Sequence, residues 1–551
     1  MHLPLAGLTV LLLASPLAGQ DLPDSARQQI DRVFTAYDRT DSPGCALGVF
    51  RDGRIVYARG YGMANLELGI AIAPSTFFDI GSTSKQFTAF AIALLEQDGR
   101  LSQGDPVRKY VPELGRYADS ITVAQLVHHA SGLRDYLVLM NLAGIRDEDW
   151  TDAGDALRLI ARQREANFPP NSEYLYSNTG YFLLSEIVER VSGQTLRRFA
   201  EARIFGPLGM RGSHFHDDHT MIVPGRATGY APKDSGGYGI AMSDFEQTGD
   251  GAVQTSVEEL IQWDRNFYSG LVGGMDLVRR QQVPWTLRNG TTLDYAAGLR
   301  VVKYRGLNTV RHGGAWAGYR AELLRFPDQK TSVACLCNRG DANPSALADR
   351  VADIILASQL QPVPMAAPRT VAEGVRLPVE LLQPRVGTWR GRRTGEVRTI
   401  VLEGDHLVWR FGGGTQALTP LAADRLQLAS GSVLQFDTQD GRPVMRPDPP
   451  IAGEETFDRM PPFTPTAAQL QAYAGRYASD ELGVTYDVVA DSAGLAATLN
   501  GRELARMSPL WPDTFGGGGV VVAFQRDSRK RLTGFAVQAG RVRNIVFARV
   551  P

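Results

Sequence analysis

The chain has 551 residues, of which 43% are hydrophobic and 21% are charged, and its formal net charge is −1. This composition is that of a folded globular protein and argues against intrinsic disorder. The balanced charge leaves no basic footprint for nucleic acid, so we predict no nucleic-acid partner. At roughly 150 residues per domain, the length predicts several domains.

An apolar run, LPLAGLTVLLLASPLA, covers residues 3–18 and is followed by small residues. The run is shorter than the roughly 20 apolar residues that cross a bilayer as a helix. We therefore predict a cleaved signal peptide over residues 1–20, an exported chain that is periplasmic or secreted, and no stable membrane span. One feature argues against this interpretation, because the segment before the run holds His2 and neither Lys nor Arg.

Residues 21–360 combine strand and helix patterns, in an order that brings strands to both ends of the segment. Apolar residues at helical spacing predict the helices, and short β-rich runs with turn residues between them predict the strands. The expected elements are a helix over 25–36, a hairpin of strands 45–50 and 54–62 with its turn at 51–53, helices over 87–98 and 181–191, three antiparallel strands over 308–338 with turns at His312–Gly314 and Pro327–Lys330, and a helix over 347–356. This order predicts an α+β domain, with an antiparallel sheet flanked by helices.

The three cysteines fit an exported protein that does not depend on disulfides. Cys335 and Cys337 alternate within an apolar strand (SVACLCN), so they share one face and cannot bond to each other. Cys45 lies in another expected strand and could bridge to either of them. Buried free thiols are the interpretation we favour.

The C-terminal third repeats itself after a linker with four prolines, residues 361–378. Gly387 in VGTWR matches Gly475 in AGRYA, 88 residues later, and TFDRM near the end of one copy matches VFARV in the other. Each copy alternates short strands and turns. We predict two small antiparallel β-barrel domains, residues 378–460 and 466–551; two unrelated β modules are the alternative.

Ser82 and Lys85 (GSTSK) begin the helix that contains Phe87. Their spacing of three residues places a hydroxyl and an amine on one helix face, one turn apart. A desolvated lysine beside a helix N-terminus can act as the base that activates a serine. Taken alone, such a serine is more often a helix cap, but Lys85 is the one lysine of the chain with serine at this offset.

Tyr176 and Asn178 (YLYSNTGY) fall in a loop that the pattern places just before a helix. A tyrosinate beside an ammonium could relay a proton from Ser82 to a leaving group and later activate water. The Asn178 amide could hold the substrate carbonyl. By itself the segment is more often a turn that packs its tyrosine.

His312 and Gly314 (VRHGGAWAG) lie on an expected strand, where glycines indicate close approach of another backbone or a ligand. A substrate could pair with this strand, and the N–H groups of Ala315 and Ser82 could form an oxyanion hole, worth about 3 kcal/mol per donor. The plain alternative is a hydrogen-bonded histidine beside a strand bulge.

Together, SxxK, YxN and HxG in this order resemble the serine β-lactamase and penicillin-binding superfamily, in particular its class C-like branch with D-aminopeptidases, DD-carboxypeptidases and esterases. The resemblance covers residues 40–358, and the trailing barrels resemble the lipocalin-like modules of three-domain D-aminopeptidases. It implies that Ser82 is acylated, Lys85 is the base, Tyr176 relays protons, and Asn178, His312, Gly314 and Ala315 bind substrate.

The resemblance further implies a serine hydrolase with no cofactor or metal, acting on a small molecule or short peptide that contains a D-amino acid. Esterase or weak β-lactamase activity at the same site is the alternative. Dedicated β-lactamases of this branch usually have lysine where His312 stands, which argues against strong β-lactamase activity. The oligomeric state and the substrate stay open.

Two rival classes remain. HFHDDH at residues 214–219 spells the HxHxDH of zinc hydrolases, but only His312 and His406 follow it as further histidine ligands, so a solvated histidine-rich turn is favoured. A catalytically inactive binding protein on the same fold is disfavoured by the complete set of motifs.

We also expect the C-terminal modules to shape substrate choice without supplying a catalytic group. Each repeat carries a glycine-rich stretch, residues 411–415 and 515–520, that could reach over a cleft. Solvated hairpin turns are the alternative for both stretches.

Overall fold

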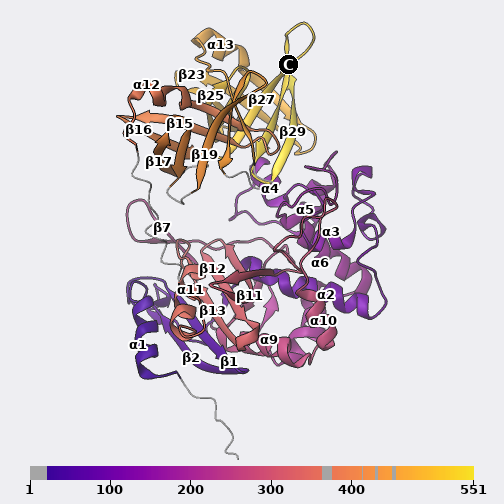
Figure 1. Cartoon of the computed structure of the whole chain (residues 1–551). Coiled ribbons are helices and arrows are strands. Elements are labelled where there is room, and N and C mark those ends of the chain that lie inside the picture. Colours follow the sequence, from indigo (N-terminus) through magenta and orange to yellow (C-terminus); the bar gives the residue numbers. More distant parts are fainter. Residues whose placement is uncertain (1–21, 363–374, 412–413, 429–431, 449–454) are drawn as a thin grey trace, which may run out of the picture.

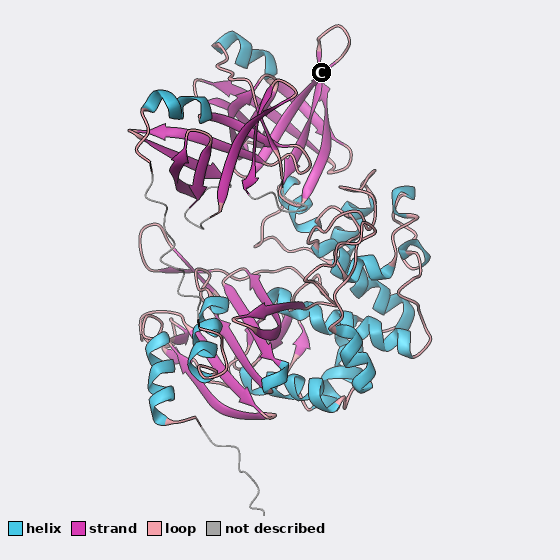
Figure 2. Cartoon of the chain, viewed as in Figure 1, coloured by secondary structure: helices cyan, strands magenta, loops and turns pink. Residues whose placement is uncertain are grey.

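The computed structural model describes residues 22–362, 375–411, 414–428, 432–448 and 455–551; the expected signal peptide and residues 363–374 of the expected linker lie outside them. An N-terminal α+β part is followed by two closed β-barrels, which lie above it in Figure 1. Figure 2 shows that most of the helices belong to the N-terminal part, whereas the barrels consist mainly of strands. This is the predicted fold class.

A six-stranded antiparallel sheet forms the centre of the N-terminal part. Its strands are β1 (Cys45–Arg51), β2 (Arg54–Tyr61), β10 (Arg300–Tyr304), β11 (Leu307–Trp316), β12 (Tyr319–Phe326) and β13 (Thr331–Cys337). Their order is β10-β11-β12-β13-β1-β2, so the N-terminal hairpin pairs with the last strand of this part. The sheet therefore joins both ends of the domain, as the sequence predicts.

Helices cover both faces of this sheet. The helices on one face are α1 (Asp24–Val33) and α11 (Pro344–Ile355), and α9 (Val257–Ser269) and α2 (Lys85–Gln97) lie on the other. Along β1, Cys45, Leu47 and Val49 pack with α1 and α11, whereas Ala46 and Phe50 belong to the core with α2 and α9. Because both faces are covered, β1 reads as a continuous apolar run.

The other helices of the N-terminal part lie mostly on the right-hand side of Figure 1, around α2. They are α3 (Val123–Val127), α4 (Tyr136–Leu142), α5 (Ala153–Ala161), α6 (Asn178–Ser192), α7 (Leu196–Ala200), α8 (Gly206–Leu208) and α10 (Gly274–Gln281), with 3₁₀ turns η1 (Gly81–Ser84), η2 (Val107–Lys109), η3 (Arg116–Ala118) and η5 (Pro327–Gln329) and a π-helical turn η4 (Glu201–Phe205). Among the described residues, no helix is both long enough and apolar enough to cross a membrane.

Small sheets of two or three short strands connect these helices. They are β3 (Met63–Asn65) with β4 (Ile70–Ala71), β5 (Phe78–Asp79) and β6 (His214–Phe215) on either side of β9 (Val253–Thr255), and β7 (Tyr230–Pro232) with β8 (Tyr238–Ile240). Pairing with β9 fixes β5, the strand that leads into η1.

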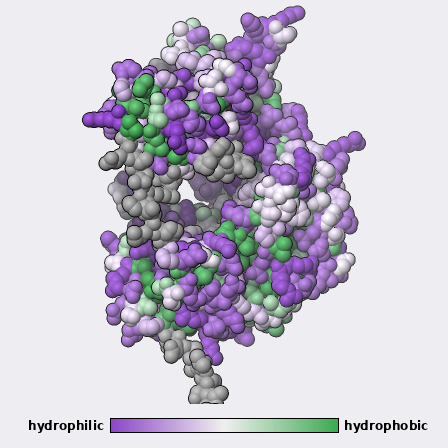
Figure 3. Space-filling model, viewed as in Figure 1, coloured by the Kyte–Doolittle hydropathy of each residue, from purple (hydrophilic) through white to green (hydrophobic). Residues whose placement is uncertain are grey.

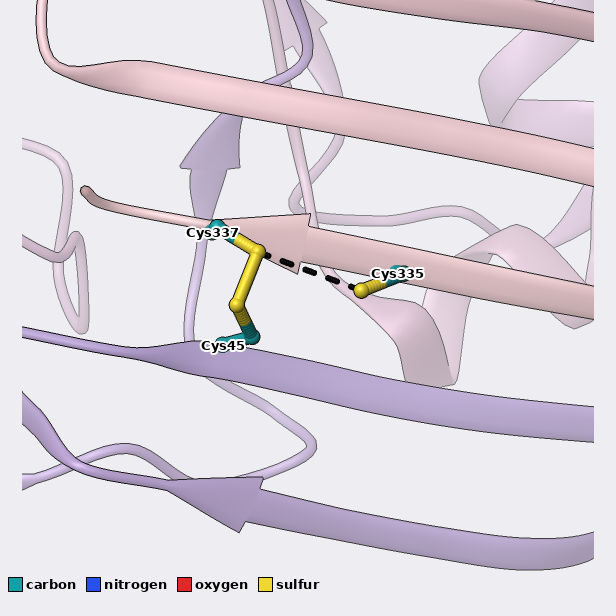
Figure 4. Close-up of side chains that lie close together, drawn as sticks. All are labelled: Cys45, Cys335 and Cys337. Atoms are coloured by element: carbon teal, nitrogen blue, oxygen red, sulfur yellow. Dashed lines mark hydrogen bonds between the residues drawn. A yellow bond between two sulfur atoms is a disulfide. The ribbon is translucent and has the colours of Figure 1, made fainter. Parts of the chain in front are cut away.

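The cysteine prediction is wrong, because Cys45 and Cys337 form a disulfide (Figure 4). They lie directly opposite each other on β1 and β13, with Cα atoms 4.0 Å apart. Neighbouring antiparallel strands bring opposed side chains this close, and the sequence alone does not say that these two strands are neighbours. Cys335 pairs in register with Leu47 and is a buried free thiol, with its Sγ 3.9 Å from that of Cys337.

The expected turn at His312–Gly314 is also wrong. These residues lie within β11, and the chain turns at Ala317 and Gly318. Ala317 has a φ of 44°, so the turn uses the left-handed conformation without a glycine at that position. Within β11, Gly314 instead allows a close approach to the Ile80 carbonyl, where a Cβ would not fit.

Two closed eight-stranded barrels follow. Barrel 1 consists of β14 (Gly387–Gly391), β15 (Val397–Glu403), β16 (His406–Phe411), β17 (Gly414–Ala422), β18 (Arg425–Leu428), β19 (Val433–Gln439), β20 (Arg442–Asp448) and β21 (Phe457–Arg459), preceded by α12 (Val379–Leu382) and η6 (Gln383–Arg385). Barrel 2 consists of α13 (Ala467–Tyr473), β22 (Gly475–Ser479), β23 (Val484–Asp491), β24 (Gly494–Leu499), β25 (Arg502–Trp511), β26 (Thr514–Gly517), β27 (Val520–Arg526), β28 (Leu532–Ala539) and β29 (Val542–Val550). The repeat is thus a repeated barrel, as predicted.

The two barrels differ in how they meet the N-terminal part. Barrel 1 has a hydrophobic core of its own, whereas the core of barrel 2 is continuous with that of the helices. The face in Figure 3 is mostly hydrophilic, and an opening separates the barrels from the N-terminal part on one side of this view. Contact is made on the side of α4, where the Tyr486 hydroxyl of barrel 2 donates to the Leu142 carbonyl.

A buried ion pair reinforces this contact. Arg134 Nη1 lies 2.6 Å from Glu481 Oε1 of barrel 2, and both side chains are buried. Arg134 also donates to the backbone carbonyls of Arg543 and Asn544, each at 2.9 Å. Barrel 2 is therefore packed against the N-terminal part of the chain near Arg134. The contact on barrel 2 includes Arg543 and Asn544, at the start of β29.

Candidate active site

Ser82 lies in η1, the single turn that leads from β5 into α2. The N–H of Gly81 donates to Asp79 Oδ1 at 2.6 Å, and Gly81 has a φ of 48°. Lys85 is the first residue of α2, and its Nζ lies 3.0 Å from Ser82 Oγ. The structure thus brings together the hydroxyl and the amine that the sequence pairs.

Lys85 is fully buried, with defined partners. Its Nζ donates to Asn178 Oδ1 at 2.9 Å and to the backbone carbonyl of Asp250. Burial lowers the pKa of Lys85, the Asp250 carboxyl opposes this, and the Arg541 charge adds to it. A neutral amine has two N–H groups and one lone pair, so the two acceptors direct the lone pair toward Ser82 Oγ.

Asn178 is held by the helix it begins. The structure places it at the first position of α6, whereas the sequence analysis placed it in a loop. Its N–H donates to Asp135 Oδ2 at 2.7 Å, and Asp135 caps α4 by accepting from the N–H of Val138. The amide side chain is thereby fixed against Lys85.

Tyr176 lies just before α6, against His129. The N–H of Ser177 donates to His129 Nδ1 at 3.2 Å, and the His129 and Tyr176 ring centres are 4.2 Å apart. The Tyr176 ring centre is 4.9 Å from Lys85 Nζ. Among the described residues, the buried Tyr176 hydroxyl has no hydrogen-bond partner, so it remains open to a substrate group.

The charge state of Tyr176 differs from the sequence hypothesis. Burial raises the pKa of Tyr176, and the Ser82 hydroxyl and the Arg541 charge only partly oppose this. The side chain is therefore a neutral phenol, not a standing tyrosinate. A neutral phenol can pass one proton on while it receives another.

His312 lies in β11 and is a neutral imidazole. Burial lowers the pKa of His312 to about 3, and the nearby Lys85 charge adds to this shift. Its Nδ1 lies 2.6 Å from the Gly313 carbonyl, and its Nε2 lies 3.0 Å from the Tyr295 hydroxyl. Since a carbonyl only accepts, Nδ1 carries the proton and Nε2 accepts from Tyr295.

Gly314 and Ala315 lie in contact with the turn that carries Ser82. A Cβ on Gly314 would come within 1.9 Å of the Ile80 carbonyl oxygen, so only glycine fits. A Cβ on Gly81 would lie 2.7 Å from the Ala315 nitrogen. The backbone of Ala315 therefore runs beside the residue before Ser82, which is the arrangement that two N–H donors to one oxygen require.

The histidines of HFHDDH are engaged separately. His214 Nε2 faces His216 Nδ1 at 3.4 Å, and His216 Nε2 faces Arg226 Nη1 at 3.2 Å. His219 instead contacts Glu246 Oε1 at 2.6 Å. Because a guanidinium occupies the outer nitrogen of His216, the pair of His214 and His216 is a poor cation site. Among the described residues, His219 instead groups with Asp218 and Glu246, three possible ligands whose donor atoms lie within 4.8 Å of one another. His214 and His216 are also half-buried beside β9, so the expectation of a solvated turn is wrong for them.

Two hollows meet at Ser82, Asn178 and Ala315. We call one the acidic hollow, since its lining includes the buried carboxyl groups of Asp79 and Asp250; Gln247, Gln254, His216 and Arg226 also line it. We call the other the arginine groove; its lining includes Tyr176, His312, Gly314, Arg300, Arg320 and Arg541. All seven residues that the sequence nominated therefore lie in the site or directly against it.

Sequence reasoning missed three supports of the site and named the wrong loop of barrel 2. Asp135, Asp250 and Tyr295 hold site residues, but no spacing marks them in the sequence, whereas the sequence pattern does place His129 at a helix end near the cleft. Residues 515–520 lie at β26 and β27 beside barrel 1 and not at the cleft, and residues 412–413 of the other glycine-rich stretch lie outside the described residues. Among the described barrel residues, Arg541 is the one that lines the site.

Known proteins resemble this chain along most of its length. Residues 30–358 match the family model described as Beta-lactamase. The D-aminopeptidase of Gluconobacter oxydans is 28% identical over 463 residues, 84% of either chain, and the D-aminopeptidase of Brucella anthropi is 25% identical over 536 residues, 94% of this chain and 97% of the relative. The octameric penicillin-binding protein homologue from Pyrococcus abyssi is 24% identical, with a TM-score of 0.55, and covers 79% of this chain and 99% of its own. The chain therefore belongs to the β-lactamase family of serine hydrolases.

Proposed function

We propose that this protein is an exported D-aminopeptidase, which hydrolyses peptides or amides that begin with a D-amino acid through an acyl-enzyme on Ser82. The observation that carries the chemistry is the buried Lys85 amine, 3.0 Å from the Ser82 hydroxyl. The relatives named D-aminopeptidase match nearly the whole chain, barrels included, and this supports the substrate class.

Export is part of the proposal. The apolar run over residues 3–18 supports it, and so does the disulfide between Cys45 and Cys337. Disulfides of this kind persist in oxidising compartments. Secretion or a periplasmic location follows from the same reasoning.

In the proposed acylation step, Lys85 Nζ takes the proton from Ser82 Oγ, and Oγ attacks the substrate carbonyl carbon. The carbonyl oxygen becomes an oxyanion, which accepts from the N–H groups of Ser82 and Ala315. Asn178 holds Lys85 in place and can donate its Nδ2–H to the acyl part of the substrate. The lowered pKa of Lys85 gives the neutral amine that this step needs.

Collapse of the oxyanion breaks the C–N bond and requires a proton on the leaving nitrogen. Tyr176 donates its hydroxyl proton to this nitrogen and takes one from the Lys85 ammonium, which restores both groups. In deacylation, water attacks the Ser82 ester, gives its proton to Tyr176, and Tyr176 passes its own to Lys85. The C–Oγ bond then breaks, and Ser82 Oγ takes this proton back from Lys85, which restores the free enzyme. The open Tyr176 hydroxyl fits this relay.

Covalent labelling tests the nucleophile. A fluorophosphonate should add once to the protein, at Ser82, as seen by intact mass and peptide mapping. Ser82→Ala should lose the label, whereas Ser84→Ala should keep it, because Ser84 Oγ accepts from the Val253 N–H. Labelling of Ser82→Ala at another residue would refute the assignment.

A substrate panel tests the substrate class. D- and L-alanine p-nitroanilides, an N-acetylated D-Ala-D-Ala peptide, a nitrophenyl ester and a chromogenic cephalosporin should be assayed with one preparation. We expect the D-anilide to be hydrolysed with a larger kcat/KM than the L-enantiomer, the ester, the cephalosporin and the N-acetylated peptide. Preference for the ester or the cephalosporin would instead support the esterase or weak β-lactamase alternative, and preference for the N-acetylated D-Ala-D-Ala peptide would support a carboxypeptidase.

A further inference from the structure

Barrel 2 contributes one side chain to the site, from the turn between β28 and β29. Arg541 lines the arginine groove together with Ser82 and Tyr176. Among the described residues that line this groove, it is the one that comes from either barrel. A side chain of barrel 2 therefore lies in the same groove as the nucleophile Ser82.

The backbone of this turn is held in place from both sides. The Arg541 carbonyl accepts from Asn167 Nδ2 at 2.9 Å and from the Asp135 N–H at 3.5 Å. The Arg543 N–H donates to Asn167 Oδ1 at 2.8 Å. Because these contacts involve backbone groups of the turn, the Arg541 side chain can be replaced without releasing the turn.

The Arg541 guanidinium lies beside Tyr176 and has unused donors. Its Cζ lies 5.6 Å from the Tyr176 ring centre, and its Nε lies 3.4 Å from Asp135 Oδ2. Its side chain is 34% exposed, and within the described part of the chain its two Nη groups have no acceptor. Two such N–H groups form the planar fork that binds a carboxylate in bidentate fashion.

The other arginines of the groove are engaged with protein groups. Arg300 Nη1 pairs with Asp294 at 2.7 Å, and Arg320 Nη1 donates to the carbonyls of Ala317 and Tyr319. Of the described residues that line the groove, Asp341 is the one carboxylate, and it pairs with Arg339 at 2.6 Å. The groove is therefore cationic. Within the described residues, Arg300 and Arg320 each use Nη1 for protein groups, whereas Arg541, next to Tyr176, has both Nη groups open.

The position of Tyr176 determines which part of a substrate enters the arginine groove. Tyr176 protonates the leaving nitrogen in the proposed mechanism, and Tyr176 lines the arginine groove but not the acidic hollow. The leaving group must therefore extend into the arginine groove. The acyl part then faces the acidic hollow, where the carboxyl groups of Asp79 and Asp250 suit the ammonium group of an N-terminal residue.

From this arrangement, and resting on the function proposed above, we infer that Arg541 binds a carboxylate on the leaving group, so that the preferred substrates are short D-aminoacyl peptides with a free carboxyl terminus. One residue spans at most about 3.6 Å. A leaving group of one residue, with a hydrogen bond at each end, can therefore bridge the Tyr176 hydroxyl and a guanidinium whose Cζ lies 5.6 Å from that ring. Amides and anilides lack the carboxylate and forgo this contact.

The test compares D-Ala-Gly with D-Ala-Gly-NH₂, which differ only in the terminal carboxylate. At one pH, the wild-type enzyme should favour the free acid in kcat/KM by at least tenfold, the size expected of a charge-assisted hydrogen bond. Arg541→Gln should reduce this ratio to within about threefold of unity, mainly through KM, and Arg541→Lys should recover part of it. A change in the protonation of Lys85 affects both substrates alike and leaves the ratio unchanged.

Arg543→Gln is the matched control, because Arg543 lies two positions after Arg541 in the sequence and contacts Glu173, but does not line the arginine groove. It should keep the wild-type ratio. The inference is overturned by a wild-type ratio near one, or by Arg541→Gln and Arg541→Lys enzymes that keep the wild-type ratio. Failure of the proposed function is separable, because it would abolish fluorophosphonate labelling of Ser82 or hydrolysis of D-alanine p-nitroanilide in the wild type.

Discussion

Replacing Gly314 by alanine should disable the site while leaving the fold in place. The new Cβ would lie 1.9 Å from the Ile80 carbonyl oxygen, where an ordinary contact begins near 3.4 Å. Strand β11 and the turn η1 must therefore separate by about 1.5 Å, and the Ala315 N–H would move away from the oxyanion position beside Ser82. Since a misplacement of about 1 Å can cost on the order of a hundredfold in rate, we expect kcat to fall a hundredfold or more.

The strain itself should lower the free energy of unfolding by about 1–3 kcal/mol, as overpacking usually does, so the variant should still fold. Steady-state hydrolysis of D-alanine p-nitroanilide measures kcat, and thermal unfolding measures stability. Gly313→Ala is the control, because its Cβ would meet the Glu322 carboxylate at 3.0 Å, a side-chain atom that can move by a few tenths of an ångström. Near-wild-type turnover in Gly314→Ala, or equal losses in the two variants, would refute the role of this close approach.

Three further predictions concern protons and metals. Tyr176→Phe should lower turnover by about 10²- to 10⁴-fold with little change in melting temperature and should accumulate acyl-enzyme; wild-type turnover would mean that the tyrosine only packs. The acylation rate should rise with pH through the Lys85 pKa, which burial places below the usual lysine value near 10.4. Arg541→Gln should move this rising part of the pH–rate profile to higher pH, because a cation that lowers the Lys85 pKa is removed. An unchanged profile would contradict this. Activity should survive exhaustive chelation, whereas loss with EDTA and recovery with zinc would revive the metallohydrolase alternative.

The fold was largely predictable, because it depends on local patterns. Alternating apolar residues, turn residues and an 88-residue repeat are all visible in the chain, and they lead to the sheet, the helices and two barrels. Strand adjacency is not local. The pairing of β1 with β13 decides that Cys45 bonds to Cys337, and nothing near either cysteine records it.

The site was predictable in its motifs and not in its supports. Ser82 and Lys85 lie one helical turn apart, so their spacing in the sequence predicts that their side chains lie close together. Tyr295 reaches His312 from an irregular segment, and Asp250 contributes a backbone carbonyl to Lys85, which any residue type could supply. Such contacts depend on how loops pack, and no periodicity or composition encodes them.

The two barrels differ at the position of Arg541, and this difference distinguishes a role in substrate binding from a role in barrel structure. Arg459 of barrel 1 and Arg549 of barrel 2 are equivalent, since each donates from Nη2 to the carbonyl just before the first strand, at 2.7 and 2.8 Å. Counting back from this pair, the position equivalent to Arg541 is Ile451. A residue needed to close the barrel would be expected in both copies, as Arg459 and Arg549 are. The arginine is instead present in the copy whose core is continuous with the helices around Ser82, which is where a substrate-binding role requires it.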